Sequence, residues 1–204
     1  MDATRGLKVK LPLPEFVVFA ADYARRLAAV LGDHDWADVT RLAEDLRDCR
    51  DDGRQVFLCG NGGSAGNAIH LANDFLYGIS KTFGVGLRVT ALPANSSVLT
   101  CLANDLGYDT IFSAQLAVQA RRGDVLIVLS GSGNSPNILK ALERAKAMGM
   151  KTYAILGYNG GKARAMADVP IHFPVNDMQL SEDLQLVVGH IIMQWLYESR
   201  PNQG

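Results

Sequence analysis

Hydrophobic residues follow two different spacings along the chain, and the spacing changes near residue 54. Over residues 15–31 and again over 36–52, apolar side chains recur every three or four positions, which is the period of an amphipathic helix. Residues 55–59 read QVFLC, a short apolar run typical of a strand that is buried on both faces. The pattern therefore predicts two helices followed by a domain built on buried strands. Residues 1–12 show no clear period and are expected to form an arm.

Strands and helices alternate through the rest of the chain. The predicted strands are 55–59, 87–91, 124–129, 151–156 and 169–173, and the predicted helices are 65–77, 96–104, 109–121, 136–148 and 177–197. Short loops between alternating elements favour a three-layer α/β fold with a doubly wound, mostly parallel sheet. We expect residues 1–53 to form an arm and a helical extension packed on the core, and residues 54–200 to form the main domain, as one structural unit.

Two turns rich in glycine and serine each follow a predicted strand and open a predicted helix. Residues 60–65 read GNGGSA and residues 130–135 read SGSGNS. Free backbone N–H groups and the positive end of a helix attract anions at such a position, and serine hydroxyls add hydrogen-bond donors for phosphate. One such turn can simply be a tight connection, but two at the carboxyl ends of one sheet favour a shared ligand crevice. A nucleotide site is disfavoured, because GxxxxGK[ST] is absent and GNGGSA lacks the last glycine of GxGxxG.

Composition narrows the functional classes. Twenty Lys and Arg against 21 Asp and Glu give a net charge of −1, which argues against a nucleic-acid-binding surface. No apolar run approaches the ~18–20 residues of a membrane span, and the first residues lack the apolar centre of a secretion signal. Three cysteines without a CxxC pair argue against a disulfide framework and against a cysteine zinc site. We therefore expect a cytoplasmic protein with no nucleic-acid or membrane partner.

Four segments together resemble the sugar isomerase (SIS) domain family. They are GNGGSA with His70 on the helix that follows, LANDLGY at 102–108, GDVLIVLSGSGNSPNILKALE at 123–143 and GYNGGK at 157–162. The resemblance covers about residues 15–197, and within the family it is greatest to the phosphoheptose isomerases. It implies a flavodoxin-like subunit in a homotetramer, with a dimer as the alternative, and active sites at subunit contacts. It also implies a metal-dependent aldose–ketose isomerase that converts sedoheptulose 7-phosphate to D-glycero-D-manno-heptose 7-phosphate.

The resemblance also implies which residues contact the substrate. The second turn is expected to hold the phosphate, and the first turn and the Asn-Asp pair of LANDLGY are expected to contact the sugar. The substrate-binding residues implied in this way are Asn61, Gly62, Gly63, Ser64, Asn104, Asp105, Ser130, Gly131, Ser132 and Ser135.

A metal site is implied on two of the helices. The family binds zinc with a His and a Glu four residues apart and a Gln and a His eight residues apart. The matching residues here are His70 and Asp74, then Glu182 and His190, so Asp replaces Glu and Glu replaces Gln. Two imidazoles and two carboxylates still suit zinc or another divalent metal. The resemblance makes Asp74 and His190 the catalytic base and acid, with Glu182 as the alternative base because a metal-bound carboxylate is a poor free base.

Spacing alone leaves this site open. His70 and Asp74 share a helix face, but such pairs often only stabilise a helix. Glu182 and His190 are separated by about 12 Å of helix rise, so their side chains must reach toward each other or act in two different chains. Glu182 could instead start the last helix, and His190 could be a core histidine. The alternative functions are a non-catalytic scaffold that binds a partner protein, an isomerase of a different sugar phosphate, and a sensor that binds a sugar phosphate without turnover. The retention of ligating residue types favours the enzyme over the scaffold.

Overall fold

The computed structural model describes residues 14–81 and 84–199, so the predicted arm at 1–12 lies outside the described residues. The chain divides into two compact units, Met1–His34 and Asp35–Gly204. In the first unit, α1 (Phe16–Gly32) has no buried residue and exposes Phe16, Val17 and Phe19. The division falls before the second helix, whereas the sequence pattern grouped both helices in residues 1–53. The second helix therefore belongs to the larger unit.

The larger unit is built on a parallel sheet. Its described strands are β1 (Gln55–Gly60), β2 (Arg88–Ala91), β3 (Val125–Ser130), β4 (Lys151–Leu156) and β5 (Val169–His172), in the order β2-β1-β3-β4-β5. Every neighbouring pair is parallel, with Leu58 level with Ile127 and Ile127 level with Tyr153. Residues 125–130 are all buried, as the uninterrupted apolar run predicts for a central strand covered on both faces. The predicted doubly wound α/β fold is confirmed.

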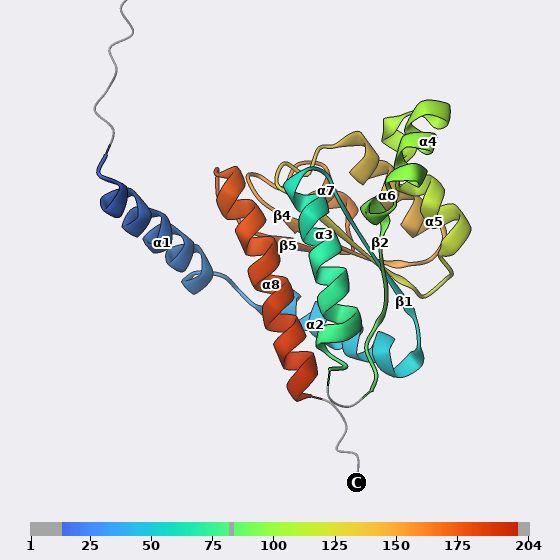
Figure 1. Cartoon of the computed structure of the whole chain (residues 1–204), viewed down its shortest axis with the longest axis horizontal. Helices are drawn as coiled ribbons and strands as arrows, with labels where there is room; N and C mark the ends of the chain where they lie inside the picture. The colour runs from blue at the N-terminus through green and yellow to red at the C-terminus, as the bar shows by residue number, and fades with distance from the viewer. Residues whose placement is uncertain (1–13, 82–83, 200–204) are drawn as a thin grey trace, which may run out of the picture. The chain divides into compact units, whose positions relative to one another are not determined.

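Helices cover both faces of the sheet (Figure 1). The described helices of the larger unit are α2 (Ala37–Asp52), α3 (Gly63–Asn73), α4 (Ser96–Leu106), α5 (Ser113–Gln119), α6 (Pro136–Ala147), α7 (Ala163–Met166) and α8 (Met178–Glu198). Phe57, Leu126 and Ala154 share one buried cluster with side chains of α5, α6 and α7. On the opposite face, α3 and α8 pack against each other, and α2 packs against α8 and the sheet. Fully buried Tyr153 joins β4 to α2, because its hydroxyl donates to the Asp45 carboxylate.

Four short segments differ from the sequence pattern. The predicted helix 65–77 changes to π-helical geometry over Asp74–Gly78, where the Ile79 N–H donates to the Asp74 carbonyl. The predicted helix 109–121 is a 3₁₀ turn at Tyr108–Thr110 followed by the shorter α5. A second 3₁₀ turn, Leu92–Ala94, and α7 were not predicted. The spacing of apolar residues does not distinguish a π-helical turn, with its i→i+5 hydrogen bonds, from an α-helix. Elements of three or four residues are too short to show any spacing pattern. No described helix has both the length and the apolar character needed to cross a membrane.

Asp168 ties the start of β5 to β4 through a set of hydrogen bonds. Its carboxylate accepts from the Thr152 N–H at 2.9 Å and from the Thr152 hydroxyl at 2.7 Å, and Lys146 Nζ lies 3.3 Å away. Burial raises the pKa of this carboxyl, but the hydrogen bonds from Thr152 and the Lys146 charge lower it more, so the net pKa lies below its ordinary value. The charged form is therefore stabilised by folding.

We expect Asp168→Asn to lower the free energy of unfolding at pH 7 by about 1 kcal/mol. Charge-assisted bonds are worth about 1.5–3 kcal/mol, and the figure is reduced because the carboxylate side chain is 34% exposed. A lowered folded-state pKa contributes stability that is present above the unfolded pKa of about 4 and is lost as pH falls through the folded value. Urea titrations should therefore show the two proteins converging below about pH 4. The control, Asp38→Asn, removes an exposed ion pair with Arg41 and should change stability by less than about 0.5 kcal/mol. Equal losses for the two variants would contradict the assignment.

Candidate active site at the carboxyl ends of β1 and β3

The strand order places a topological switch point between β1 and β3. The chain leaves β1 toward β2 on one side and leaves β3 toward β4 on the other, and open α/β sheets bind ligands in the crevice at such a point. The turn GNGGSA follows β1 and the turn SGSGNS follows β3, so both reach this crevice. A pocket of about 260 Å³ lies there. Its lining residues are Asn61, Gly62, Gly63, Ser64, Leu129, Ser130, Gly131, Ser132, Ser135, Met178 and Glu182.

The structure brings most of the expected substrate-binding residues into this one pocket. The exceptions are Asn104 and Asp105, which lie exposed on α4 and do not line it. Asn104 Nδ2 donates to Asp105 Oδ1 at 2.7 Å, and the Cys101 thiol contacts the other Asp105 oxygen at 3.5 Å. The resemblance implied that this pair contacts the sugar, but in the single chain the two residues lie outside the pocket.

The serine turn keeps its hydroxyl protons available. Ser130 Oγ accepts from the Gly133 N–H at 3.1 Å, and Ser132 Oγ accepts from the Asn134 N–H at 3.3 Å. A hydroxyl that accepts in this way can still donate its own proton. Ser135 is the N-cap residue of α6 but makes no capping bond with its side chain. The turn therefore presents hydroxyl donors to the pocket, an arrangement suited to the oxygens of a phosphate.

The loop after β4 holds the serine turn in place through backbone hydrogen bonds. The Gly157 N–H donates to the Gly131 carbonyl at 3.0 Å, and the Ala163 N–H donates to the Gly133 carbonyl at 2.9 Å. Gly133 has φ +65°, and a Cβ there would collide with the Gly160 carbonyl oxygen. Only glycine satisfies both conditions without strain. The GYNGGK segment thus acts here as a backbone support for the serine turn.

His70, Asp74 and His190 form a second cluster, between α3 with its π-helical end and α8. The two Nε2 atoms of His70 and His190 lie 2.9 Å apart, and each lies 3.4 Å from Asp74 Oδ2. Tetrahedral zinc with bonds of about 2.0–2.1 Å separates its ligand atoms by roughly 3.3–3.4 Å. Both His–Asp separations match this value, while the two imidazole nitrogens lie at a hydrogen-bond distance from each other. Two imidazoles and one carboxylate are ligand types that zinc takes. In the described part of the chain, these three side chains form the group that could hold a metal ion.

Glu182, the fourth residue expected to bind the metal, stands apart from that cluster in the single chain. It lies two turns before His190 on α8, about 12 Å along the helix axis, and it lines the pocket with the serine turn instead. A Cβ on Gly63 would collide with its carboxylate, so Glu182 lies directly against the first turn of α3. Its carboxylate is therefore placed beside the substrate pocket and outside the His-Asp-His group.

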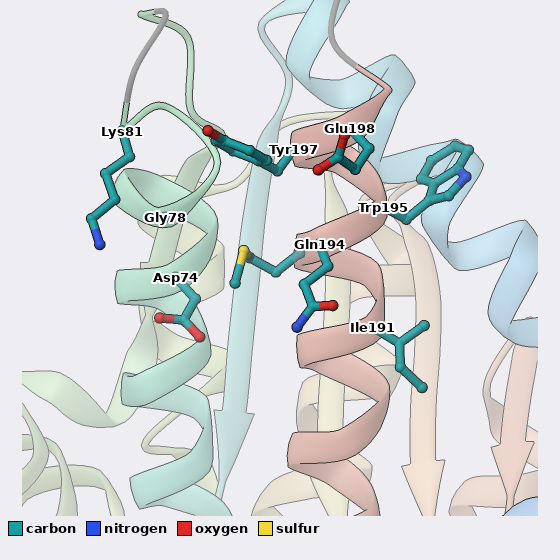
Figure 2. Close-up of a pocket in the computed structure, with 9 residues that line it drawn as sticks. Asp74, Gly78, Lys81, Ile191, Gln194, Trp195, Tyr197 and Glu198 are labelled. Atoms are coloured by element: carbon teal, nitrogen blue, oxygen red, sulfur yellow. The ribbon is translucent and has the colours of Figure 1, made fainter.

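Asp74 of this cluster also lines a larger groove, with a volume of about 650 Å³ (Figure 2). Asp74 and Gly78 border it on the π-helical segment, and Ile191, Trp195 and Tyr197 border it on α8. Ile191 and Trp195 are large apolar side chains that remain exposed in the single chain. The cluster is thus next to an apolar surface.

Cysteine chemistry takes no part in either site. Burial raises the pKa of the Cys49 thiol to about 11 and raises that of Cys59 further. The hydrogen bond and negative charge of Asp105 raise the pKa of the exposed Cys101 thiol. Because the thiolate is the reactive form, none of the three is activated as a nucleophile.

The sequence did not single out three residues that either line the pocket or bond to a residue that lines it. Met178, the first residue of α8, lines it. Tyr108 donates its hydroxyl to Asn61 Oδ1 at 3.1 Å, and Asn137 pairs with the same amide. Both Tyr108 and Asn137 belong to segments that carry the family resemblance, 102–108 and 123–143, so a signal was present, but neither residue was selected.

Comparison with known proteins agrees with this geometry. The SIS domain family model matches residues 19–157. A phosphoheptose isomerase of Chlorobaculum parvum is 37% identical over 182 residues, covering 88% of this chain and 87% of that protein. One of Akkermansia muciniphila is 37% identical over 174 residues, covering 85% and 89%. The solved structure of a phosphoheptose isomerase from Neisseria gonorrhoeae has a TM-score of 0.81 at 27% identity and covers 90% of this chain and 100% of its own.

Proposed function

We propose, since the chain belongs to the SIS domain family and to the phosphoheptose isomerases within it, that its substrate is sedoheptulose 7-phosphate. The enzyme is a sugar-phosphate isomerase, an intramolecular oxidoreductase. The proposed product is D-glycero-D-manno-heptose 7-phosphate, and the proposed cofactor is Zn²⁺ or another divalent metal. The observation that carries the proposal is the pocket at the switch point. Two turns with hydroxyl and N–H donors meet there, and the first residues of α8, the helix that bears His190, complete the lining.

The proposed role of each group follows from its place. Ser130, Ser132 and Ser135 hold the phosphate through their hydroxyl protons. About 12 Å of α8 separates Glu182 at this pocket from His190, which suits a sugar with several carbons between its phosphate and its reacting carbons. Asp74 and His190 move a proton from C1 to C2 through an enediol. His70, Asp74 and His190 would hold the metal, which polarises the carbonyl and the adjacent hydroxyl when it is bound.

The test of the function is turnover of sedoheptulose 7-phosphate followed by NMR, with metal content measured on the same sample. Formation of the aldoheptose 7-phosphate, its loss with a chelator and its return with zinc would support the whole proposal. Bound metal without turnover would reject this substrate in favour of another sugar phosphate. Turnover that is unaffected by complete metal removal would reject the metal.

Glu182→Gln tests the charge beside the phosphate turn. We expect the KM for the sugar phosphate to fall roughly tenfold, because a carboxylate near a bound phosphate costs about 1 kcal/mol or more at an effective dielectric constant near 20. The turnover number should change little, since Asp74 and His190 carry the proton. The alternative, in which Glu182 is the base, gives the opposite kinetics, with a kcat lower by ~10²–10⁴ and an unchanged KM. Glu143→Gln, the same charge change on the exposed face of α6, is the matched control.

We also propose that the enzyme is a homotetramer, or at least a dimer, located in the cytoplasm. Two features support self-association, namely the exposed apolar residues of α1 and the exposed Ile191 and Trp195 beside the metal cluster. A second copy would bury such surfaces, and it is also the route by which a Glu182 carboxylate could approach a His-Asp-His group. The native mass from light scattering checks the assembly, and a monomer at micromolar concentration would contradict it.

A further inference from the structure

We infer that Asn137 is a positioning residue that fixes the side-chain amide of Asn61 so that only an N–H group faces the ligand. The inference rests on the proposed function, because it concerns the same pocket. The two amides form a reciprocal pair: Asn61 Nδ2 donates to Asn137 Oδ1 at 2.9 Å, and Asn137 Nδ2 donates to Asn61 Oδ1 at 2.8 Å. Asn61 lines the pocket, whereas Asn137 is only 1% exposed and does not line it. Asn137 therefore acts through Asn61.

A backbone group decides which way the pair is oriented. The Ile138 N–H, in the first turn of α6, donates to Asn137 Oδ1 at 3.0 Å. Because a backbone N–H can only donate, the atom that faces it must be the amide oxygen of Asn137. That oxygen in turn requires a donor from Asn61, so Nδ2 of Asn61 must face it, and Oδ1 of Asn61 then faces Asn137 Nδ2. The helix backbone thus sets the orientation of an amide in the other turn.

Tyr108 completes the hydrogen bonding of Asn61. Its hydroxyl donates to Asn61 Oδ1 at 3.1 Å, so this oxygen accepts from both Asn137 and Tyr108. An amide oxygen has two lone pairs and its NH₂ group has two protons. Both lone pairs are used, and one Nδ2 proton goes to Asn137, which leaves one proton for the pocket. Asn61 can therefore donate to an oxygen of the sugar phosphate but cannot accept from a hydroxyl.

The same pair sets the spacing of the two ligand-binding turns. Asn61 belongs to the turn after β1, and Asn137 belongs to the helix that follows the serine turn after β3. A double hydrogen bond between the buried amide of Asn137 and the half-buried amide of Asn61 fixes both the distance and the relative direction of the two segments. Loss of the pair should raise the KM more than it lowers kcat, because Asn61 binds the substrate and is remote from the proton-transfer groups in the proposed mechanism.

Asn137→Asp tests the inference with a change of almost no volume. One aspartate oxygen can still accept from Ile138 N–H and from Asn61, but at pH 8 the other oxygen faces Asn61 Oδ1 without a proton between them. Protonation of the aspartate restores a donor. We expect the KM at pH 8 to rise ~10-fold or more relative to the wild type, the loss of about one hydrogen bond to a charged group, and the ratio of the two KM values to approach one as pH falls. Gln115→Glu, at a buried amide bonded to the Leu92 and Ile111 carbonyls, is the matched control and should leave the KM unchanged.

A readout without turnover keeps this test separate from the proposed function. In ¹⁵N NMR spectra, the side-chain NH₂ protons of Asn61 should exchange unequally with water in the wild type, since one is bonded to Asn137 and one faces the pocket. Asn137→Asp should remove the difference at pH 8 and regain it at lower pH. Tyr108→Phe, at a side chain that is 60% exposed, should fold normally and leave the difference intact. Equal exchange of the two protons in the wild type, or an unchanged difference in Asn137→Asp, would overturn the inference. Absence of turnover by the wild type would reject only the proposed function.

Discussion

Replacing His190 with alanine is expected to lower kcat for the sugar phosphate by ~10²–10⁴, the contribution of a positioned acid or base. His190 Nε2 lies 2.9 Å from His70 Nε2 and 3.4 Å from Asp74 Oδ2, so the variant loses both a proton-transfer group and one of three clustered ligand atoms. Bound zinc should therefore fall together with activity. The half-buried His190 ring contributes little to the core, and the melting temperature should stay within a few degrees of the wild-type value.

His34→Ala provides the matched control, since His34 lies in the smaller unit, Met1–His34. It should retain wild-type kcat and metal content. The outcome against the proposal would be a His190→Ala protein with kcat within threefold of the wild type. Loss of zinc with retained kcat would assign His190 to the metal alone and leave proton transfer to another group.

The fold was predictable because its signals are local and redundant. The buried apolar run of β3 and the turn with Pro136 at the start of α6 together indicate one strand–turn–helix unit. Because such units repeat along the chain, the sequence predicts a parallel sheet. The π-helical turn at Asp74 was not predictable, since it adds one residue to a helical turn without changing the apolar pattern. That turn matters to the site because it begins at a residue of the metal cluster.

The site residues that lie together in one turn could be predicted from the sequence. Those whose role depends on a contact between two distant segments could not. The two turns carry their chemistry in consecutive residues, so Ser130, Ser132 and Asn61 could be selected from the sequence. Asn137 could not, because its importance arises from a contact between segments 76 positions apart. Glu182 was selected for the metal site because a carboxylate suits a metal. In the single chain, however, the rise of α8 places it at the substrate pocket.

Ser132→Asp should reduce kcat/KM for the sugar phosphate by about 10³, mostly through KM. Ser132 lines the pocket, and its Oγ already accepts from the Asn134 N–H, so an aspartate there would direct a carboxylate at the place proposed for the phosphate. Two like charges about 4 Å apart cost roughly 4 kcal/mol at an effective dielectric constant of 20, which is close to a thousandfold in affinity. Raising the salt concentration should recover part of the loss, because the repulsion is screened.

Two further variants separate the effect of the added charge in Ser132→Asp from the effect of losing the Ser132 hydroxyl. Ser132→Ala removes only a hydroxyl donor, and we expect a loss of about tenfold, as for one hydrogen bond to a charged group. Ser97→Asp makes the same charge change at the exposed start of α4, where a negative charge suits the helix end, and it should leave KM unchanged. A KM for Ser132→Asp within threefold of the wild type would mean that the phosphate binds elsewhere. Since Gly133 and the loop after β4 hold the turn through backbone contacts that this substitution does not touch, such a result could not be attributed to a rearranged turn.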